Sequence, residues 1–184
     1  NMYNMKHLNL ILFFLTATFT MVTAQETHII FIGNSITQGV ILEEPQTTSP
    51  PAQTMAWLAA ESDHSFSFTN CGVSGKTTID FLPAKGTHFN KVLEAADAAR
   101  AKGAHLLFSV MLGTNDSAIR GPLGAPVHPE QYQTNIRAIA DALLARYPGA
   151  MILLHRPIWY SPNTHNNSSY LREGLERLNS YLPV

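Results

Sequence analysis

Short apolar runs alternate with helix-like periodic segments along most of the chain. Residues 29–32, 106–112 and 151–154 are almost wholly apolar, and a further strand is predicted at 66–70. Between them, apolar side chains recur at helical spacing over residues 51–61, 89–102 and 129–147. Apolar runs without alternation are typical of strands that are buried on both faces. The pattern therefore predicts an α/β fold with a parallel sheet and helices on both of its sides.

A last helix is expected near the end of the sequence. Ser168 or Ser169 is predicted to cap it, since serine is a preferred N-cap residue. Its apolar stripe would comprise four leucines: Leu171, Leu175, Leu178 and Leu182.

The beginning of the chain has the pattern of a targeting segment. A weakly basic start is followed by about 15 mostly apolar residues, 8–22. Val22 and Ala24 fit a signal-peptidase site with cleavage before Gln25. The run is shorter than the roughly 20 residues that cross a bilayer, so no integral membrane span is expected. We therefore predict a signal peptide over 1–24 and a periplasmic or secreted protein; the alternative is an uncleaved anchor.

Composition narrows the function classes. The chain has 184 residues, 12 Lys plus Arg, 13 Asp plus Glu and a formal net charge of -1. This length predicts one domain, residues 25–184. The near-neutral charge, without a cluster of basic residues, argues against binding to nucleic acid. Cys71 is the single cysteine, and no histidine pair has ligand spacing with a carboxylate, so neither a metal nor another cofactor is expected. The pattern favours no particular oligomeric state.

The chemistry is expected where the strands end, because sites of parallel α/β sheets lie at the carboxyl ends of the strands. Ser35 comes two residues after Gly33, Gly75 follows the second strand, and Asn115 follows the third. Each has an ordinary structural explanation: a helix cap, a turn glycine or an Asx-turn. Together they match acyl transfer, which needs a nucleophile and donors for the oxyanion.

Three segments of the chain, taken together, resemble the motifs of one family: residues 33–37, 70–75 and 113–116. In order and spacing they resemble blocks I, II and III of the SGNH (GDSL-type) hydrolases. The resemblance implies a three-layer α/β/α, flavodoxin-like fold and serine esterase activity. It implies Ser35 as the nucleophile and the Ser35 and Gly75 backbones with the Asn115 side chain as oxyanion donors.

Two departures from the family pattern stand out. Asn34 stands where the name-giving motif has an aspartate, and we expect this difference to alter the function rather than to abolish it. We also expect Asn34 to lie on the substrate side. The family places an Asp-x-x-His near its C-terminus, and no aspartate precedes a histidine by three residues here. We therefore expect a C-terminally truncated domain whose catalytic His and Asp lie beyond Val184. His155, after the fourth strand, is the candidate base within the chain and is otherwise a substrate-side residue.

The resemblance extends to bacterial esterases that remove acetyl groups from sialic acids or xylan-type glycans. We therefore expect a carbohydrate or small-molecule ester as the substrate, with Trp159 and the loop 119–126 on the substrate side. No extended apolar segment predicts a site for a fatty chain, so a short acyl group is expected. The alternatives are a non-catalytic glycan-binding module and a lipase or thioesterase that acts on longer acyl chains.

Overall fold

A computed structural model describes residues 25–161 and 170–181. The predicted signal segment, Ser168, Ser169 and Leu182 lie outside these residues. The strands are β1 (Thr27–Gly33), β2 (Phe66–Asn70), β3 (His105–Met111) and β4 (Met151–Leu154). The helices are α1 (Ser35–Gln38), α2 (Pro45–Thr48), α3 (Pro50–Glu61), η1 (Pro83–Lys85), α4 (Thr87–Ala101), α5 (Pro129–Arg146) and α6 (Leu171–Asn179).

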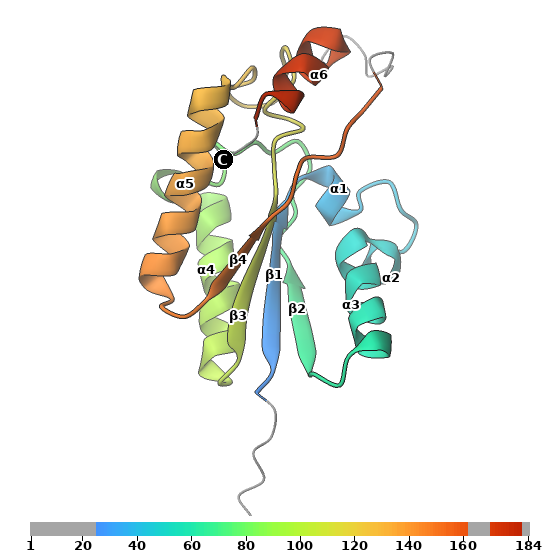
Figure 1. The fold of residues 1–184 in the computed structure, drawn as a ribbon, viewed down its shortest axis with the longest axis vertical. Coiled ribbons are helices and arrows are strands. Elements are labelled where there is room, and N and C mark those ends of the chain that lie inside the picture. Colours follow the sequence, from blue (N-terminus) through green and yellow to red (C-terminus); the bar gives the residue numbers. More distant parts are fainter. Residues whose placement is uncertain (1–24, 162–169, 182–184) are drawn as a thin grey trace, which may run out of the picture.

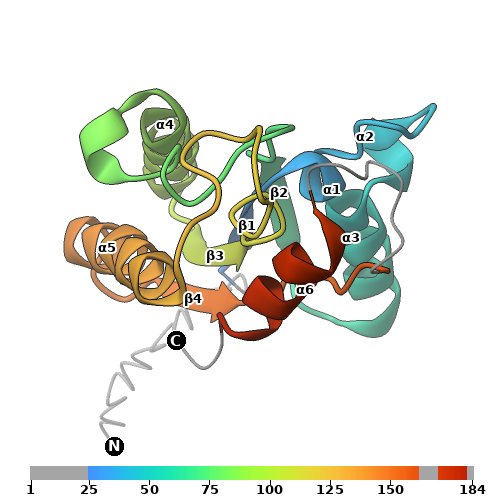
Figure 2. The same cartoon turned by 90° about the horizontal axis from the view of Figure 1, so that it is seen from above.

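The four strands form one parallel sheet in the order β2-β1-β3-β4 (Figure 1). Helices α4 and α5 lie on one face of the sheet and α3 lies on the other, so the molecule has three layers (Figure 2). This order corresponds to the first four strands of the flavodoxin-like arrangement. The predicted α/β/α fold is confirmed. Because all strands run in the same direction, their carboxyl ends share one edge, where α1 and α6 also lie.

The core lies mainly between the sheet and helices α4 and α5. Successive side chains of a strand point to opposite faces. Ile30 and Ile32 of β1 therefore share a face with Phe108 of β3, and all three are at most 1% exposed. They pack in one cluster with Val92 of α4 and Ile139 of α5. The predicted burial of the first strand on both faces is confirmed, since its residues 29–32 are all buried.

The fourth strand departs from the expected burial. Met151, Leu153 and Leu154 are 54%, 48% and 42% exposed. β4 is an edge strand of the described sheet, and α3 packs at the other edge, against β2, so α3 does not cover β4 (Figure 2). An apolar run predicts a strand but not its position within the sheet, which explains the difference.

Most predicted boundaries agree with the structure within two residues. The three short helices α1, α2 and η1 were not expected, because elements of three or four residues have no measurable periodicity. In α6, Leu175 and Leu178 are buried, whereas Leu171 of the predicted stripe is 44% exposed. Over residues 25–161 and 170–181, no helix combines the length and apolar character needed to cross a bilayer.

Candidate active site

Ser35 lies in a tight turn between β1 and α1. A Cβ at Gly33 would collide with the side chain of Thr37, so the turn requires a glycine there. Asn34 Oδ1 accepts a hydrogen bond from the Ile36 N–H at 3.0 Å and caps the helix. Ser35 itself is half-buried, and its hydroxyl has no hydrogen bond to another residue of the described ranges. This hydroxyl is therefore available to react.

Asn34, which was expected on the substrate side, is buried in the turn. The residue is 1% exposed, and its side-chain oxygen is used for the helix cap. The substrate contact expected of Asn34 stays a prediction. Asparagine, aspartate and serine are all good caps, so the Asn34 departure from the family motif keeps the turn that presents Ser35.

The loop after β2 is bonded to the Ser35 turn. The Val73 N–H donates to the Gly33 carbonyl at 3.0 Å, and Asn70 Nδ2 donates to the Thr37 carbonyl at 2.8 Å. Farther along, Gly75 is exposed and has a φ of +75°, a left-handed conformation that favours glycine. Its N–H makes no hydrogen bond within the part of the chain that the structure describes. This loop therefore lies against the Ser35 turn and leaves a backbone donor unused.

Asn115 joins the third loop to the second. Its side chain is buried, and Nδ2 donates to the Lys76 carbonyl at 2.9 Å, one residue beyond Gly75. Its Oδ1 accepts from the Tyr170 hydroxyl at 2.7 Å. An amide nitrogen has two hydrogens, so one N–H of Asn115 is left for a ligand. The structure thus brings the three predicted segments into one hydrogen-bonded group at the carboxyl edge.

Asp116 is a site-supporting residue to which the sequence pattern gave no role, although it ends the Gly-Thr-Asn-Asp motif. Its Oδ1 accepts hydrogen bonds from the N–H and the hydroxyl of Thr78, and Oδ2 is buried without a partner. Burial raises the pKa of this carboxyl to about 6, against the opposing effect of the Thr78 hydrogen bonds. Asn135 of α5 also donates to the Thr78 hydroxyl, at 2.8 Å. The second and third loops are therefore joined at two neighbouring points.

The substitution Asp116→Asn is expected to stabilise the protein, relative to the native chain, increasingly as the pH rises. Because the pKa is raised from 3.8 to about 6, the folded state binds this proton more tightly than the unfolded state does. The native chain therefore loses up to roughly 3 kcal/mol of folding free energy as the pH rises through that interval, and asparagine does not titrate. Urea unfolding of both proteins at about pH 4 and about pH 7 measures the difference. An equal difference at the two pH values would contradict the prediction.

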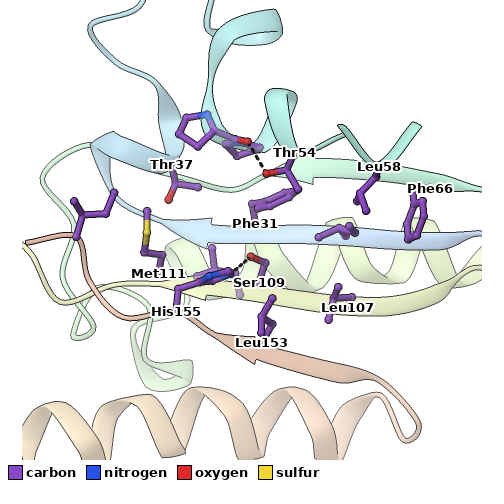
Figure 3. A pocket seen from close by; sticks show the side chains of 15 residues that line it. Phe31, Thr37, Thr54, Leu58, Phe66, Leu107, Ser109, Met111, Leu153 and His155 are labelled. Carbon is purple, nitrogen blue, oxygen red and sulfur yellow. Dashed lines mark hydrogen bonds between the residues drawn. The ribbon is translucent and has the colours of Figure 1, made fainter. Parts of the chain in front are cut away.

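His155 follows β4, but its side chain points toward the α3 face of the sheet (Figure 3). Its Nε2 is hydrogen-bonded to Ser109 Oγ at 2.8 Å. Partial burial lowers the pKa of the imidazole, so it is neutral at pH 7. The structure shows a contact with Ser109 and none with Ser35, so the expected role of His155 at the reacting groups stays a prediction. Trp159 is 61% exposed on the same edge, and its substrate contact stays a prediction as well.

An apolar pocket of about 390 Å³ lies between α3 and the sheet (Figure 3). Apolar side chains such as Phe31, Leu107 and Leu153 make up most of its wall. Thr37, two residues after Ser35, lines one end with Ser109 and His155. The sequence pattern gave no sign of this pocket, because its wall combines residues of all four strands with one side of α3.

Comparisons with known proteins agree with this geometry. Residues 31–183 match the model of the GDSL-like lipase/acylhydrolase family. The chain belongs to this family. The predicted resemblance to SGNH (GDSL-type) hydrolases is thereby confirmed, and the protein's class is that of carboxylic ester hydrolases. A search among curated proteins found no match.

Several solved structures share the fold at low sequence identity. Esterase EstA from Pseudoalteromonas sp. is 20% identical, with a TM-score of 0.52, over 84% of this chain and 69% of the other. The acetyl xylan esterase Axe2 from Geobacillus stearothermophilus is 19% identical, with a TM-score of 0.54, over 86% and 71%. TesA is 23% identical, with a TM-score of 0.53, over 84% and 68%.

No metal centre forms among the described residues. Within residues 25–161 and 170–181, no three His, Cys, Asp or Glu side chains are grouped so that they can hold a metal ion. His28, for example, is hydrogen-bonded to Ser67 and Thr69 on β2. The arrangement at the carboxyl edge offers a hydroxyl and polar N–H donors, which is the set that acyl transfer uses.

Proposed function

We propose that this protein is a serine esterase that removes short acyl groups, above all acetyl, from carbohydrates. In this proposal Ser35 is the nucleophile, and the N–H groups of Ser35 and Gly75 with the amide of Asn115 bind the oxyanion. The observation that carries the proposal is the hydrogen-bonded contact of the three loops, with one Asn115 N–H left unused. Donors fixed in this way stabilise a developing negative charge without first having to reorganise.

The reaction follows the general serine pathway. Ser35 Oγ attacks the ester carbonyl carbon, its proton passes to a general base, and the carbonyl oxygen becomes the oxyanion. When the intermediate collapses, the sugar oxygen leaves and takes up the proton. Water then attacks the acyl-enzyme in the same way, releases the carboxylic acid and regenerates Ser35. No residue is assigned here as the base: His155, the candidate among the described residues, has its Nε2 hydrogen-bonded to Ser109.

Two observations support a carbohydrate substrate. Trp159 exposes 61% of its surface beside the carboxyl edge, and an exposed aromatic face suits the apolar face of a sugar ring. Acetyl xylan esterases are among the proteins that share this fold. Export by the apolar segment at residues 8–22 would bring the enzyme to polysaccharides outside the cytoplasm.

The carbohydrate part of the proposal is tested by Trp159→Ala. We expect KM for an acetylated xylo-oligosaccharide to rise about tenfold, since a stacking contact of roughly 1 kcal/mol or more is lost. The kcat/KM for nitrophenyl acetate, which has no sugar ring, should stay within about twofold. Steady-state kinetics on both substrates provide the measurement.

Trp57→Ala is the matched control, because Trp57 is equally exposed but lies on α3. It should leave both substrates unaffected. Equal effects of Trp159→Ala on the two esters would remove the support for a sugar contact at this position.

The apolar pocket favours a second candidate, hydrolysis of longer acyl esters. Its volume of about 390 Å³ is enough for an acyl chain, and Thr37 connects its polar end to the Ser35 turn. A series of nitrophenyl esters separates the candidates: kcat/KM falls from acetyl to octanoyl in the first case and rises in the second. In the second case, Leu107→Trp should fill the pocket and remove the preference for long chains.

A further inference from the structure

An oxyanion donor on an asparagine side chain works in only one of two orientations. The amide oxygen and nitrogen have nearly the same shape, and a rotation by 180° exchanges them. With Asn115 rotated, its oxygen would face the Lys76 carbonyl oxygen and the developing oxyanion, and both contacts would be repulsive. The partners of Asn115 therefore decide whether this residue can serve in catalysis.

Two partners hold the amide from opposite ends. The Lys76 carbonyl accepts from Nδ2 at 2.9 Å, and a carbonyl can only accept. The Tyr170 hydroxyl donates to Oδ1 at 2.7 Å. A bond donated to the amide oxygen also polarises the amide, so its remaining N–H becomes a stronger donor.

Tyr170 is itself held in place by neighbouring side chains. Its ring packs edge-to-face on Tyr160, with ring centres 5.3 Å apart. The Tyr160 hydroxyl lies 2.9 Å from Ser117 Oγ, and because Ser117 donates to the Thr114 carbonyl, Tyr160 is the donor in this pair. Arg177 of α6 donates to the Ser117 carbonyl at 2.8 Å. Residues 160 and 170–177 therefore cover the third loop, where Figure 2 shows α6 above the carboxyl edge.

We propose that Tyr170 is a positioning residue for ester hydrolysis, whose hydroxyl fixes the Asn115 amide with one N–H directed at the oxyanion. This inference rests on the proposed function, since it concerns the same oxyanion site. It assigns a role to the segment before α6, which lies 55 residues after Asn115 in the chain. Burial raises the pKa of Tyr170, so the hydroxyl keeps its proton at neutral pH.

The test compares Tyr170→Phe with Tyr160→Phe in the full chain. Each variant removes one hydroxyl from the same aromatic pair, but only the Tyr170 hydroxyl contacts Asn115. We expect Tyr170→Phe to lower kcat about tenfold on nitrophenyl acetate with KM nearly unchanged, and Tyr160→Phe to stay within about twofold. Combined with Asn115→Ala, Tyr170→Phe should have no further effect, because its target is gone.

A second readout does not depend on activity. The side-chain NH₂ signals of Asn115 in a ¹⁵N–¹H NMR spectrum are identified by their loss in Asn115→Ala. They should shift or broaden in Tyr170→Phe and stay unchanged in Tyr160→Phe. Unchanged signals in Tyr170→Phe, or an equal loss of kcat in the Asn115→Ala background, would overturn the role of Tyr170. Hydrolysis that survives Ser35→Ala would instead overturn the proposed function, whatever the NMR spectra show.

Discussion

Replacing Ser35 with alanine is expected to lower kcat for ester hydrolysis by about four to six orders of magnitude. The substitution removes the atom that forms the acyl-enzyme, and the remaining oxyanion donors support only a small residual rate. The fold should be unaffected, since the Ser35 hydroxyl has no hydrogen bond within the described ranges and the turn depends on Gly33 and Asn34. Stopped assays on nitrophenyl acetate and thermal unfolding provide the two measurements.

Ser65→Ala serves as the control for this experiment. Ser65 is an exposed serine just before β2, at the end of the sheet away from the site. It should keep the activity of the native chain. If Ser35→Ala hydrolyses the ester at a similar rate to Ser65→Ala, then Ser35 is not the nucleophile.

Asn115→Ala is expected to reduce kcat by about 10²–10³-fold with little change in KM, because its N–H is needed only after the oxyanion forms. The same substitution leaves the Lys76 carbonyl and the Tyr170 hydroxyl without their partner. We therefore also expect a loss of about 1–3 kcal/mol in the free energy of unfolding. Kinetics and urea unfolding separate the two effects.

Asn135→Ala is a matched control for that stability loss. Asn135 is also a buried asparagine, 1% exposed, with hydrogen bonds to Thr78 and Gln131. Its truncation should cost a similar amount of stability and leave kcat within about threefold. A change confined to KM in Asn115→Ala would make Asn115 a substrate-binding residue.

Much of the site was predictable because its parts are local in the sequence. Apolar runs identify strands, and in a parallel sheet all carboxyl ends share one edge. Residues that follow successive strands, such as Ser35, Gly75 and Asn115, must then lie near one another. Glycine at 33 and 75 also has a local cause, namely a close approach and a left-handed backbone.

Other features depend on which segments pack together, and the pattern along the chain does not encode this directly. The apolar run of residues 151–154 predicts a strand, but only the strand order makes it an exposed edge. Asn34 is buried because its side-chain oxygen caps the short helix after the tight turn. The side chain of His155 lies on the α3 face, where its imidazole is hydrogen-bonded to Ser109 of the neighbouring strand.

The fold class, the family and the loops that carry the candidate chemistry follow from the sequence alone, because periodicity, glycine positions and short motifs act over a few residues. Three features depend on the packing of distant segments: the orientation of Asn115, the link that Asp116 makes between two loops through Thr78, and the position of the apolar pocket. The contact between Tyr170 and Asn115 joins positions 55 residues apart. Such contacts form because the folded chain must give buried polar groups a hydrogen-bond partner, and the partner is whichever segment the packing brings within reach.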